Sequence, residues 1–486
     1  MKKKIALLVI VIIVIIILSI VLIDEKTKQY GTVLTYTNDA NAFIVFDPPK
    51  LCIVGESILG KMVLADELEI KNCSWYDYIA QEGNTENGGT SKWANAKTKD
   101  GSIWVWVPRY AYKITYNNEE DKSAGGKIDV IFLKGTSNKD KNGEDVTKKG
   151  YIVHPAFKNG ARNNYSNGEW NKELPGIWVS KFEAGYAGLK NTAGENVQAI
   201  DTSMIYKTVG NNVYGEVIEN ETKIKYPIYI GRTYSYNNLD VGEMFKLSKE
   251  LTKEGNPYGF DSKNIDSHMM KNSEWGAVAY LAHSQYGRNG TKITINNVCN
   301  EKIVGASAIT GYAADEINQA ENIINEEIIG DELNNSYAWY TKKGTLASTT
   351  GNMYGIYDMV GGTIEYVAGY LENISENFMI YTENFGNIKT GNKYCTIYKN
   401  NTTEEKEDNY VANSKVYGDA TIEISKQGEN YTSWNGEPSF YITSNSAFFL
   451  RGGCYGEGEF AGIFCYEIHS GHLSLDHGFR TVLINI

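Results

Sequence analysis

The 486-residue chain is poor in cysteine, in proline and in net positive charge. Its six cysteines contain no Cys-x-x-Cys pair, which excludes a zinc ribbon or a thioredoxin-type motif. They are also too few for a disulfide scaffold of this length, although the even number permits up to three bridges of undetermined connectivity. Lys and Arg total 47 against 59 Asp and Glu, for a formal charge of −12. Because phosphate neutralisation needs basic surface, no nucleic-acid partner is expected.

The composition indicates a folded chain with a large core. Hydrophobic residues make up 42% and aromatic residues 12% of the sequence. The 48 glycines and 35 tyrosines favour many turns and aromatic strands over a helical bundle. No fixed-period repeat occurs, so a solenoid or a propeller is not expected.

The N-terminus has the pattern of a membrane anchor. Three lysines precede an apolar run from Ile5 to Ile23, in which Ser19 is the only polar residue. At about 1.5 Å per residue, a helix of this length approaches the ~30 Å hydrocarbon core of a bilayer. A cleaved signal peptide is the alternative, but no Ala-x-Ala pattern follows the run. We predict an uncleaved signal anchor at 1–23, with the N-terminus inside and the rest of the chain outside a cell membrane.

The pattern after the anchor predicts a tether and one large domain. Residues 24–64 form the tether, with a short β segment at 32–36 and 42–46. Residues 65–486 form the domain, with insertions at about 186–262 and 373–445. The stretches 287–345 and 373–445 are polar and rich in Asn and Glu, and they are expected to be long loops or insertions.

Periodicity within the domain predicts several strands and one helix. Aromatic alternation from Ile103 to Lys113 predicts a strand at a sheet edge. Two further strands are expected at 128–133 and 176–183. Apolar residues spaced i, i+3, i+4 and i+7 predict a helix from Asp266 to His283.

Sequence blocks that occur in a fixed order carry a family resemblance. They are Trp178–Glu183, Asn272–Ala282, Gly351–Tyr366, Phe449–Tyr455 and Gly478–Leu483. In this order they resemble the formylglycine-generating-enzyme (sulfatase-modifying-factor) superfamily, over about residues 66–486. The resemblance implies an α+β domain of C-type-lectin-like fold with many loops.

Four charged residues of these blocks are expected to be structural. They are Asp358, Glu365, Arg451 and Arg480. Asp358 and Arg451 lie in apolar sequence, where an unpaired charge would be costly, so each of these two should find a polar or charged partner. The resemblance also implies that structural calcium could lie near Glu365, although Gly362 stands where the family has Asn.

An enzymatic role is the alternative that the resemblance raises. The family's copper-dependent oxidases use two cysteines separated by four residues, whereas Cys454 and Cys465 are separated by ten. An oxidase acting on a protein cysteine through this pair remains an alternative. The ligand spacing of the iron-dependent sulfoxide synthases is absent, and no nucleophile elbow occurs.

Two further segments have residues at spacings that resemble metal sites. Cys465, His469, His472 and His477 combine thiolate and imidazole at spacings that can suit zinc. The segment from Asn138 begins like a calcium loop, but its twelfth position is Lys149 rather than Glu, which favours a solvated turn. The occupancy of a metal site is left open.

The C-terminal segment 454–477 has the composition of a binding surface. Tyr, His, Ser and Asp on glycine-supported loops combine rigid aromatic area with adaptable hydrogen bonds. The predicted ligand-contacting residues are Tyr455, Glu457, Phe460, Tyr466, His469, His472, Asp476 and His477.

The same layout resembles the variable proteins of diversity-generating retroelements. In these proteins, adenines are randomised mostly at Asn codons. Tyr455, His469, Ser470, His472, Asp476 and His477 are reachable from such a codon, whereas three glutamates of the segment are not.

The sequence therefore predicts a surface-displayed, non-catalytic protein that binds an extracellular protein or glycan. A fixed lectin-like loop, the oxidase and a structural surface protein are the alternatives.

Overall fold

The computed structural model describes two short N-terminal strands and most of residues 93–485. Within that range, the larger stretches left undescribed are 161–169, 187–225, 301–306, 325–329, 374–380, 382–392, 402–405 and 428–430. The predicted anchor at 1–23 lies outside the described residues. In the described part, no helix has both the length and the apolar character to cross a bilayer. The proposed division into anchor, tether and domain stays a prediction.

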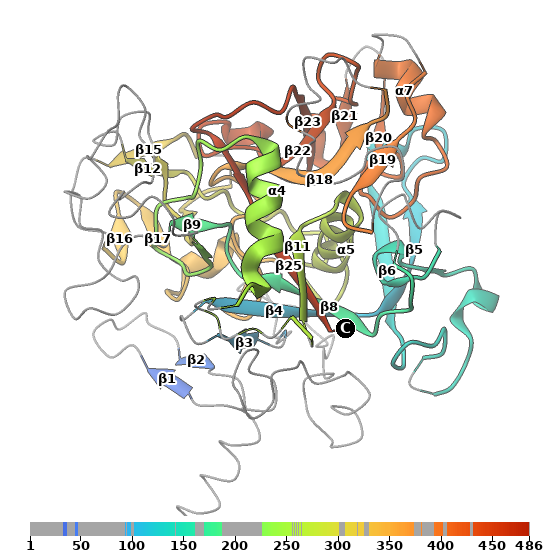
Figure 1. Ribbon diagram of the computed structural model, residues 1–486, viewed down its shortest axis with the longest axis horizontal. Coiled ribbons are helices and arrows are strands. Elements are labelled where there is room, and N and C mark those ends of the chain that lie inside the picture. The colour runs from blue at the N-terminus through green and yellow to red at the C-terminus, as the bar shows by residue number, and fades with distance from the viewer. Residues whose placement is uncertain are drawn as a thin grey trace, which may run out of the picture.

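Two short strands lie in the stretch for which a β segment was predicted. β1 (Val33–Thr35) and β2 (Ile44–Phe46) pair antiparallel. Elsewhere the described residues are mostly β structure with few helices (Figure 1).

A five-stranded sheet combines strands from residues 95–180 with two strands from later in the chain. Its strands run in the order β11 (Ile265–Met269), β25 (Thr481–Asn485), β8 (Gly176–Ser180), β4 (Ile103–Pro108) and β3 (Asn95–Lys97). All of its described pairings are antiparallel. The aromatic strand was expected at a sheet edge, but β4 lies between β8 and β3. Alternating Trp and Val fit this inner position because both faces of the strand are buried.

A second sheet carries the C-terminal segment. It has the order β19 (Thr396–Tyr398), β18 (Ile364–Leu371), β22 (Phe448–Gly452) and β23 (Gly462–His469). β24 (His477–Phe479) runs parallel to the start of β18. The chain passes from β24 directly into β25, so Arg480 lies between a strand of each sheet.

The predicted helix begins later than expected. Residues 265–269 form β11, and α5 runs from Asn272 to His283. The Glu274 carboxylate accepts the backbone N–H of Lys271 at 2.9 Å, which marks the true start of the helix. The other α-helices of the described part are α4 (Val241–Lys249), which begins with a capping box at Asp240 and Glu243, and α7 (Lys406–Ala412).

Short elements surround the two sheets. The remaining strands are β5 (Tyr110–Tyr116), β6 (Gly126–Phe132), β7 (Ile152–Val153), β9 (Gly185–Tyr186), β10 (Pro227–Ile228), β12 (Val298–Asn300), β13 (Ser307–Ala308), β14 (Tyr312–Ala314), β15 (Asn322–Ile324), β16 (Glu332–Leu333), β17 (Ser336–Ala338), β20 (Ser425–Lys426) and β21 (Thr432–Ser433). The 3₁₀ helices are η3 (Lys122–Ala124), η4 (Val146–Lys149), η5 (Pro155–Phe157), η6 (Glu250–Thr252), η7 (Gly344–Ala347), η9 (Trp434–Gly436) and η10 (Gly458–Phe460).

These short elements correct the expectation that 287–345 and 373–445 are long loops. The strands β12 to β17 fall in the first stretch, and β19 to β21 with α7 in the second. Buried amides hold the first stretch: Asn322 donates to the hydroxyl of Ser336 at 2.9 Å, and Ser336 in turn donates to Asn297 at 2.7 Å. Polar side chains used in this way give no hydrophobic period in the sequence.

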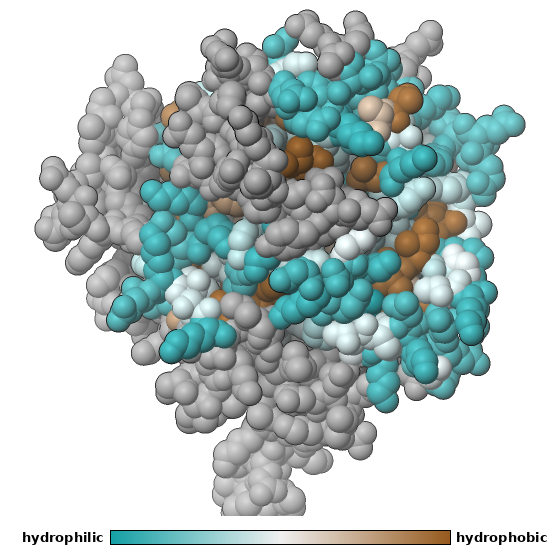
Figure 2. Space-filling model, turned by 45° about the vertical axis from the view of Figure 1, so that its right-hand side comes forward, coloured by the Kyte–Doolittle hydropathy of each residue, from teal (hydrophilic) through white to brown (hydrophobic). Residues whose placement is uncertain are grey.

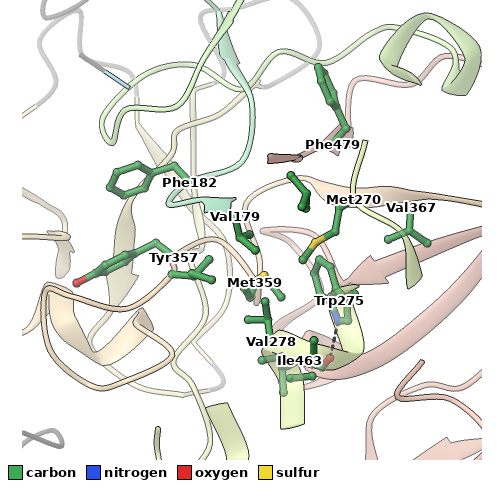
Figure 3. Close-up of a cluster of buried hydrophobic side chains, with 14 of the residues drawn as sticks. Val179, Phe182, Met270, Trp275, Val278, Tyr357, Met359, Val367, Ile463 and Phe479 are labelled. Atoms are coloured by element: carbon green, nitrogen blue, oxygen red, sulfur yellow. Dashed lines mark hydrogen bonds between the residues drawn. The ribbon is translucent and has the colours of Figure 1, made fainter. Parts of the chain in front are cut away.

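The core lies between the two sheets and α5. Trp275 of α5 points toward β23, where its indole N–H donates to the carbonyl of Ile463 at 2.9 Å (Figure 3). Val179, Met359 and Phe479 belong to the same buried cluster. Residues from β8, α5, β23 and β24 all contribute to this core. The core therefore holds β23 and β24 in place.

Candidate functional site

Two loops leave the second sheet on either side of β23. The first, the 453–461 loop, joins β22 to β23 and contains η10. The second, the 470–476 loop, joins β23 to β24. β22 and β23 pair in a continuous antiparallel register from Phe448 to Arg451. The loops therefore rise from a framework whose geometry is fixed by the sheet.

One hydrogen bond joins the two loops. The phenol of Tyr455 donates to Oδ1 of Asp476 at 3.0 Å. The backbone N–H of Tyr455 also donates to the carbonyl of Gly362 at 2.8 Å, beside the start of β18. The two loops therefore present one surface.

The start of α4 holds the other side of the 470–476 loop. The backbone N–H groups of Asn238 and Val241 donate to the carbonyls of Ser474 and Gly471 at 2.9 and 3.0 Å. The side chain of Asn237 donates to the carbonyl of Leu475 at 2.5 Å. Nothing in the sequence pointed to these contacts, because residues 237–241 lie far from the loop in the chain.

The structure divides the predicted ligand-contacting residues into exposed and buried groups. Phe460 is 54% exposed at the tip of the 453–461 loop, and His472 is exposed on the 470–476 loop. Leu473, which was not predicted, is 44% exposed beside His472. Glu457, His469 and Asp476 are partly exposed.

Three predicted contact residues are buried, which corrects the sequence reading. Tyr466 is fully buried on β23, with its hydroxyl 2.7 Å from that of Ser425. Tyr455 and His477 are also buried. Their aromatic rings support the loops from below, and composition could not separate such residues from exposed ones.

The three C-terminal histidines gather at the base of the 470–476 loop. The ring of His469 lies 4.2 Å from that of His472 and 4.3 Å from that of His477, between centroids. Nδ1 of His469 is hydrogen-bonded to the hydroxyl of buried Tyr366. Burial, and then the charge of His472, lower the pKa of His469 to about 4. Burial, and then the charge of His469, lower the pKa of His477 to about 3. His469 and His477 are therefore neutral at physiological pH.

Carboxylates line the side of the 453–461 loop. Burial, and then the nearby charge of Glu467, raise the pKa of Glu457 to about 7. Burial also raises the pKa of Glu467. This part of the surface can therefore change charge near neutral pH.

The structure does not bring Cys465 and the three histidines into a zinc-binding arrangement. Cys465 is fully buried, and no group of three or more His, Cys, Asp or Glu in the described part of the chain is placed to hold a metal ion.

In both candidate calcium segments, the carboxylate that could bind calcium already accepts hydrogen bonds from the protein. In the segment that begins like a calcium loop, Oδ1 of Asp140 accepts the backbone N–H groups of Asn142 and Glu144 at 2.9 and 3.0 Å. The carboxylate thus closes a turn, as Asp commonly does. The carboxylate of Glu365 is bound by Arg480, which leaves it a poor calcium ligand.

The four charged residues predicted to be structural do have partners. Nε of Arg480 donates to Glu365 at 2.8 and 3.1 Å, and both side chains are essentially fully buried. Asp358, with a φ of 57°, accepts the backbone N–H of Gly311 and the amide of Asn296, both at 2.8 Å. Burial raises the pKa of Asp358 to about 6.

The two Nη atoms of Arg451 bind amide and carbonyl oxygens, whereas its Nε is buried without a hydrogen-bond partner. Its Nη1 donates to Oδ1 of Asn272 at 2.9 Å and to the carbonyl of Asp419 at 3.1 Å, and its Nη2 donates to the carbonyl of Ala420 at 3.1 Å. The guanidinium also lies over the ring of Trp275, 5.5 Å from the centroid. This arrangement ties β22 to α5 and the 419–420 turn.

Sequence reasoning missed a third buried carboxylate beside this group. Glu183 accepts the hydroxyl of Ser235 at 2.5 Å and the backbone N–H of Thr363 at 2.9 Å. Burial, and then the charges of Asp358 and Glu365, raise its pKa well above the ordinary value. Its place in the Trp178–Glu183 block was the only available signal.

Four of the six cysteines lie in the described part of the chain. Cys299, Cys395, Cys454 and Cys465 are free. Burial, and then the charge of Glu457, raise the pKa of Cys454, and burial also raises the pKa of Cys465. Because a thiolate is the nucleophile and the metal ligand, these environments disfavour the chemistry of the oxidase alternative.

Comparison with known proteins adds little to this description. No protein-family model matches the chain, and no curated protein matches its sequence. A solved structure described as "Major Tropism Determinant I1 Variant" is similar over 83% of this chain and 83% of its own, with 10% identity and a TM-score of 0.23. A TM-score this low does not establish that the two chains share a fold.

Proposed function

We propose that this chain is a surface-displayed, non-catalytic ligand-binding protein of C-type-lectin-like fold. It contacts an extracellular protein or glycan through the 453–461 and 470–476 loops, and the segment at 1–23 anchors it in the membrane. The observation that carries the proposal is the Tyr455–Asp476 hydrogen bond, which makes one surface of two loops on a rigid sheet.

The exposed chemistry of this surface supports the proposal. Phe460 and Leu473 offer apolar area, while His472 and Glu459 offer hydrogen-bonding groups beside it. Elsewhere, the face seen in Figure 2 is largely hydrophilic among the coloured residues, with small separate apolar patches. Aromatic anchors that become buried in an interface carry much of its binding energy, and Phe460 is an exposed ring that can serve as one.

Screening with defined probes tests this proposal. The full chain would be screened against a random-peptide phage library and a glycan array, with the double variant Phe460→Ser/Leu473→Ser in parallel. Val411→Ser/Tyr417→Ser is the matched control, because these side chains are 66% and 47% exposed on another part of the chain. We expect binding that the loop variant loses and the control retains. Binding that is equal in all three, or absent from both probe sets, would count against the proposal.

We further propose that the segment is diversified, on the resemblance to retroelement variable proteins. Of the positions reachable from an Asn codon, His469, Ser470, His472 and Asp476 are exposed at least in part. Deep sequencing of codons 451–480 from one clonal culture tests this. Substitutions confined to such positions, with Arg451–Gly453 and Gly478–Arg480 unchanged, are expected. A uniform sequence would favour a fixed lectin-like binder.

A further inference from the structure

A small cavity lies beneath the start of β23, at the end of α5. It offers about 20 Å³ to the centre of a water molecule. The end of α5, the 288–293 turn, η9 and the first residues of β23 line it. Its titratable lining residues are His283, Arg288, Lys292 and Glu437.

Arg288 has the least compensated charge in this lining. The residue is only 8% exposed, and its side chain has one described acceptor, the carbonyl of Lys292, 3.0 Å from Nη2. Its Nε is buried and has no hydrogen-bond partner. No carboxylate of the described residues lies within ion-pair distance of it. Burial lowers the pKa of Arg288 to about 10, so the side chain is still charged at neutral pH.

Two other buried arginines show what compensation is normal in this fold. Arg480 is paired with the Glu365 carboxylate. Arg451 donates to three oxygens, from Asn272 and two backbone carbonyls, although its Nε, like that of Arg288, is buried without a hydrogen-bond partner. A buried donor left unmade costs about 1–3 kcal/mol, and more if it is charged. Arg288 therefore has unused binding capacity that an oxygen acceptor from outside the chain can fill.

The remaining polar residues of the cavity do not neutralise Arg288. Oε2 of Glu437 accepts the backbone N–H of Phe464 at 2.8 Å, and its Oε1 accepts the amide of Asn435 at 3.0 Å. His283 lies 3.4 Å from the carbonyl of Gly126, and burial lowers its pKa, so it is neutral. Burial raises the pKa of Glu437 to about 7, and the positive charge of Lys292, on the partly exposed rim, acts against this rise.

We propose that this cavity binds a carboxylate group, held at the Nε edge of Arg288 and assisted by Lys292. The planar guanidinium fork matches the two oxygens of a carboxylate. The volume suits a group of the size of one or two water molecules, so the rest of a larger acid would lie outside the cavity. A small free acid, a peptide terminus and a uronic sugar share this chemistry. The site goes beyond the loop surface and does not depend on it.

Fluorine NMR with fluoroacetate as the probe tests the site. The full chain in detergent should broaden the fluoroacetate signal saturably, and acetate should reverse the broadening. We expect Arg288→Gln to weaken binding by about tenfold or more, because a charge-assisted bidentate contact is lost. Lys343→Gln removes the same charge at an exposed pair with Asp315 and should leave binding unchanged. Competition by N-acetylalanine or by glucuronate would separate the peptide from the sugar source.

Two outcomes would overturn the proposal. One is the absence of saturable broadening with the wild-type chain, and the other is equal broadening by the wild type and Arg288→Gln. If Arg288→Gln does not fold, the partly exposed Lys292→Gln decides, since unchanged affinity in that variant would contradict the site. Phe460→Ser/Leu473→Ser should bind fluoroacetate normally, so failure of the loop surface and failure of this cavity can be told apart.

Discussion

Tyr455 donates its phenolic hydroxyl to Asp476 across the gap between the 453–461 and 470–476 loops, at 3.0 Å. The two residues lie on opposite sides of β23 in the chain, yet this bond makes their loops one surface. The carbonyl of Asp476 also accepts the backbone N–H of Ile364 at 2.9 Å, so the joined loops rest on the start of β18.

Removing this bond should weaken the chain measurably. We expect Tyr455→Phe to lower the free energy of unfolding by about 1 kcal/mol, because the Asp476 carboxylate loses its phenolic donor. Urea denaturation measures this. Tyr417→Phe, at a ring that is 47% exposed, is the control and should change little. Equal stability of wild type and Tyr455→Phe would show that the loops are not coupled through this bond.

The ion pair between the sheets should matter far more. Glu365→Gln leaves the guanidinium of Arg480 buried without a carboxylate, and we expect a loss of about 3–5 kcal/mol. Lys127→Gln, which breaks an exposed pair with Asp129, should have little effect. Thermal unfolding of both variants provides the comparison. A small loss in Glu365→Gln would mean that other groups, Glu183 among them, already compensate Arg480.

The histidines at the base of the 470–476 loop predict a loss of stability in acid. Their pKa values are about 4 for His469 and about 3 for His477, below the value of about 6.5 in an unfolded chain. The unfolded state therefore binds more protons in this window. The stability that these two neutral histidines provide is complete above about pH 6.5. It is lost progressively as the pH falls to their folded-state pKa values of about 4 and about 3.

The variant His477→Gln isolates this effect from the other titrating groups. Its stability should fall less than that of the wild type between pH 7 and pH 5, as measured by urea midpoints. The same fall in both proteins would contradict a buried neutral His477.

The thiols give a test of the oxidase alternative. Because the pKa values of Cys454 and Cys465 are raised, both should react slowly with iodoacetamide at pH 8 in the native chain and rapidly in urea. Peptide mass spectrometry reports each site separately. Rapid native labelling of either thiol would reveal a thiolate and revive the enzymatic interpretation.

The sequence predicted the parts of this fold that have a hydrophobic period. The strand at 176–180 and the helix after 272 alternate or repeat apolar residues clearly. The single strand expected from Ile103 to Lys113 is divided at Arg109 into β4 and β5, which belong to different sheets. Residues 266–271 were wrongly joined to that helix, because Met269 and Met270 fit either period and the capping contact of Glu274 is visible only in three dimensions.

The sequence located the candidate site in the chain, but it did not show which side chains of the site are exposed. The order of the C-terminal blocks located the segment 454–477, but the loss of Tyr466 to the core follows from its pairing beside β22. The support from 237–241 depends on contacts across more than 200 residues of chain, such as that of Asn237 with Leu475. Neither feature has a local signal.

Amide hydrogen exchange of the full chain, alone and with a probe selected from the peptide library or glycan array, tests the central claim most directly. Ligand contact through the loops predicts protection within 456–460 and 470–475, with 406–417 unchanged. Protection that excludes both loops, or that appears only at 406–417, would contradict a binding surface formed by the joined loops.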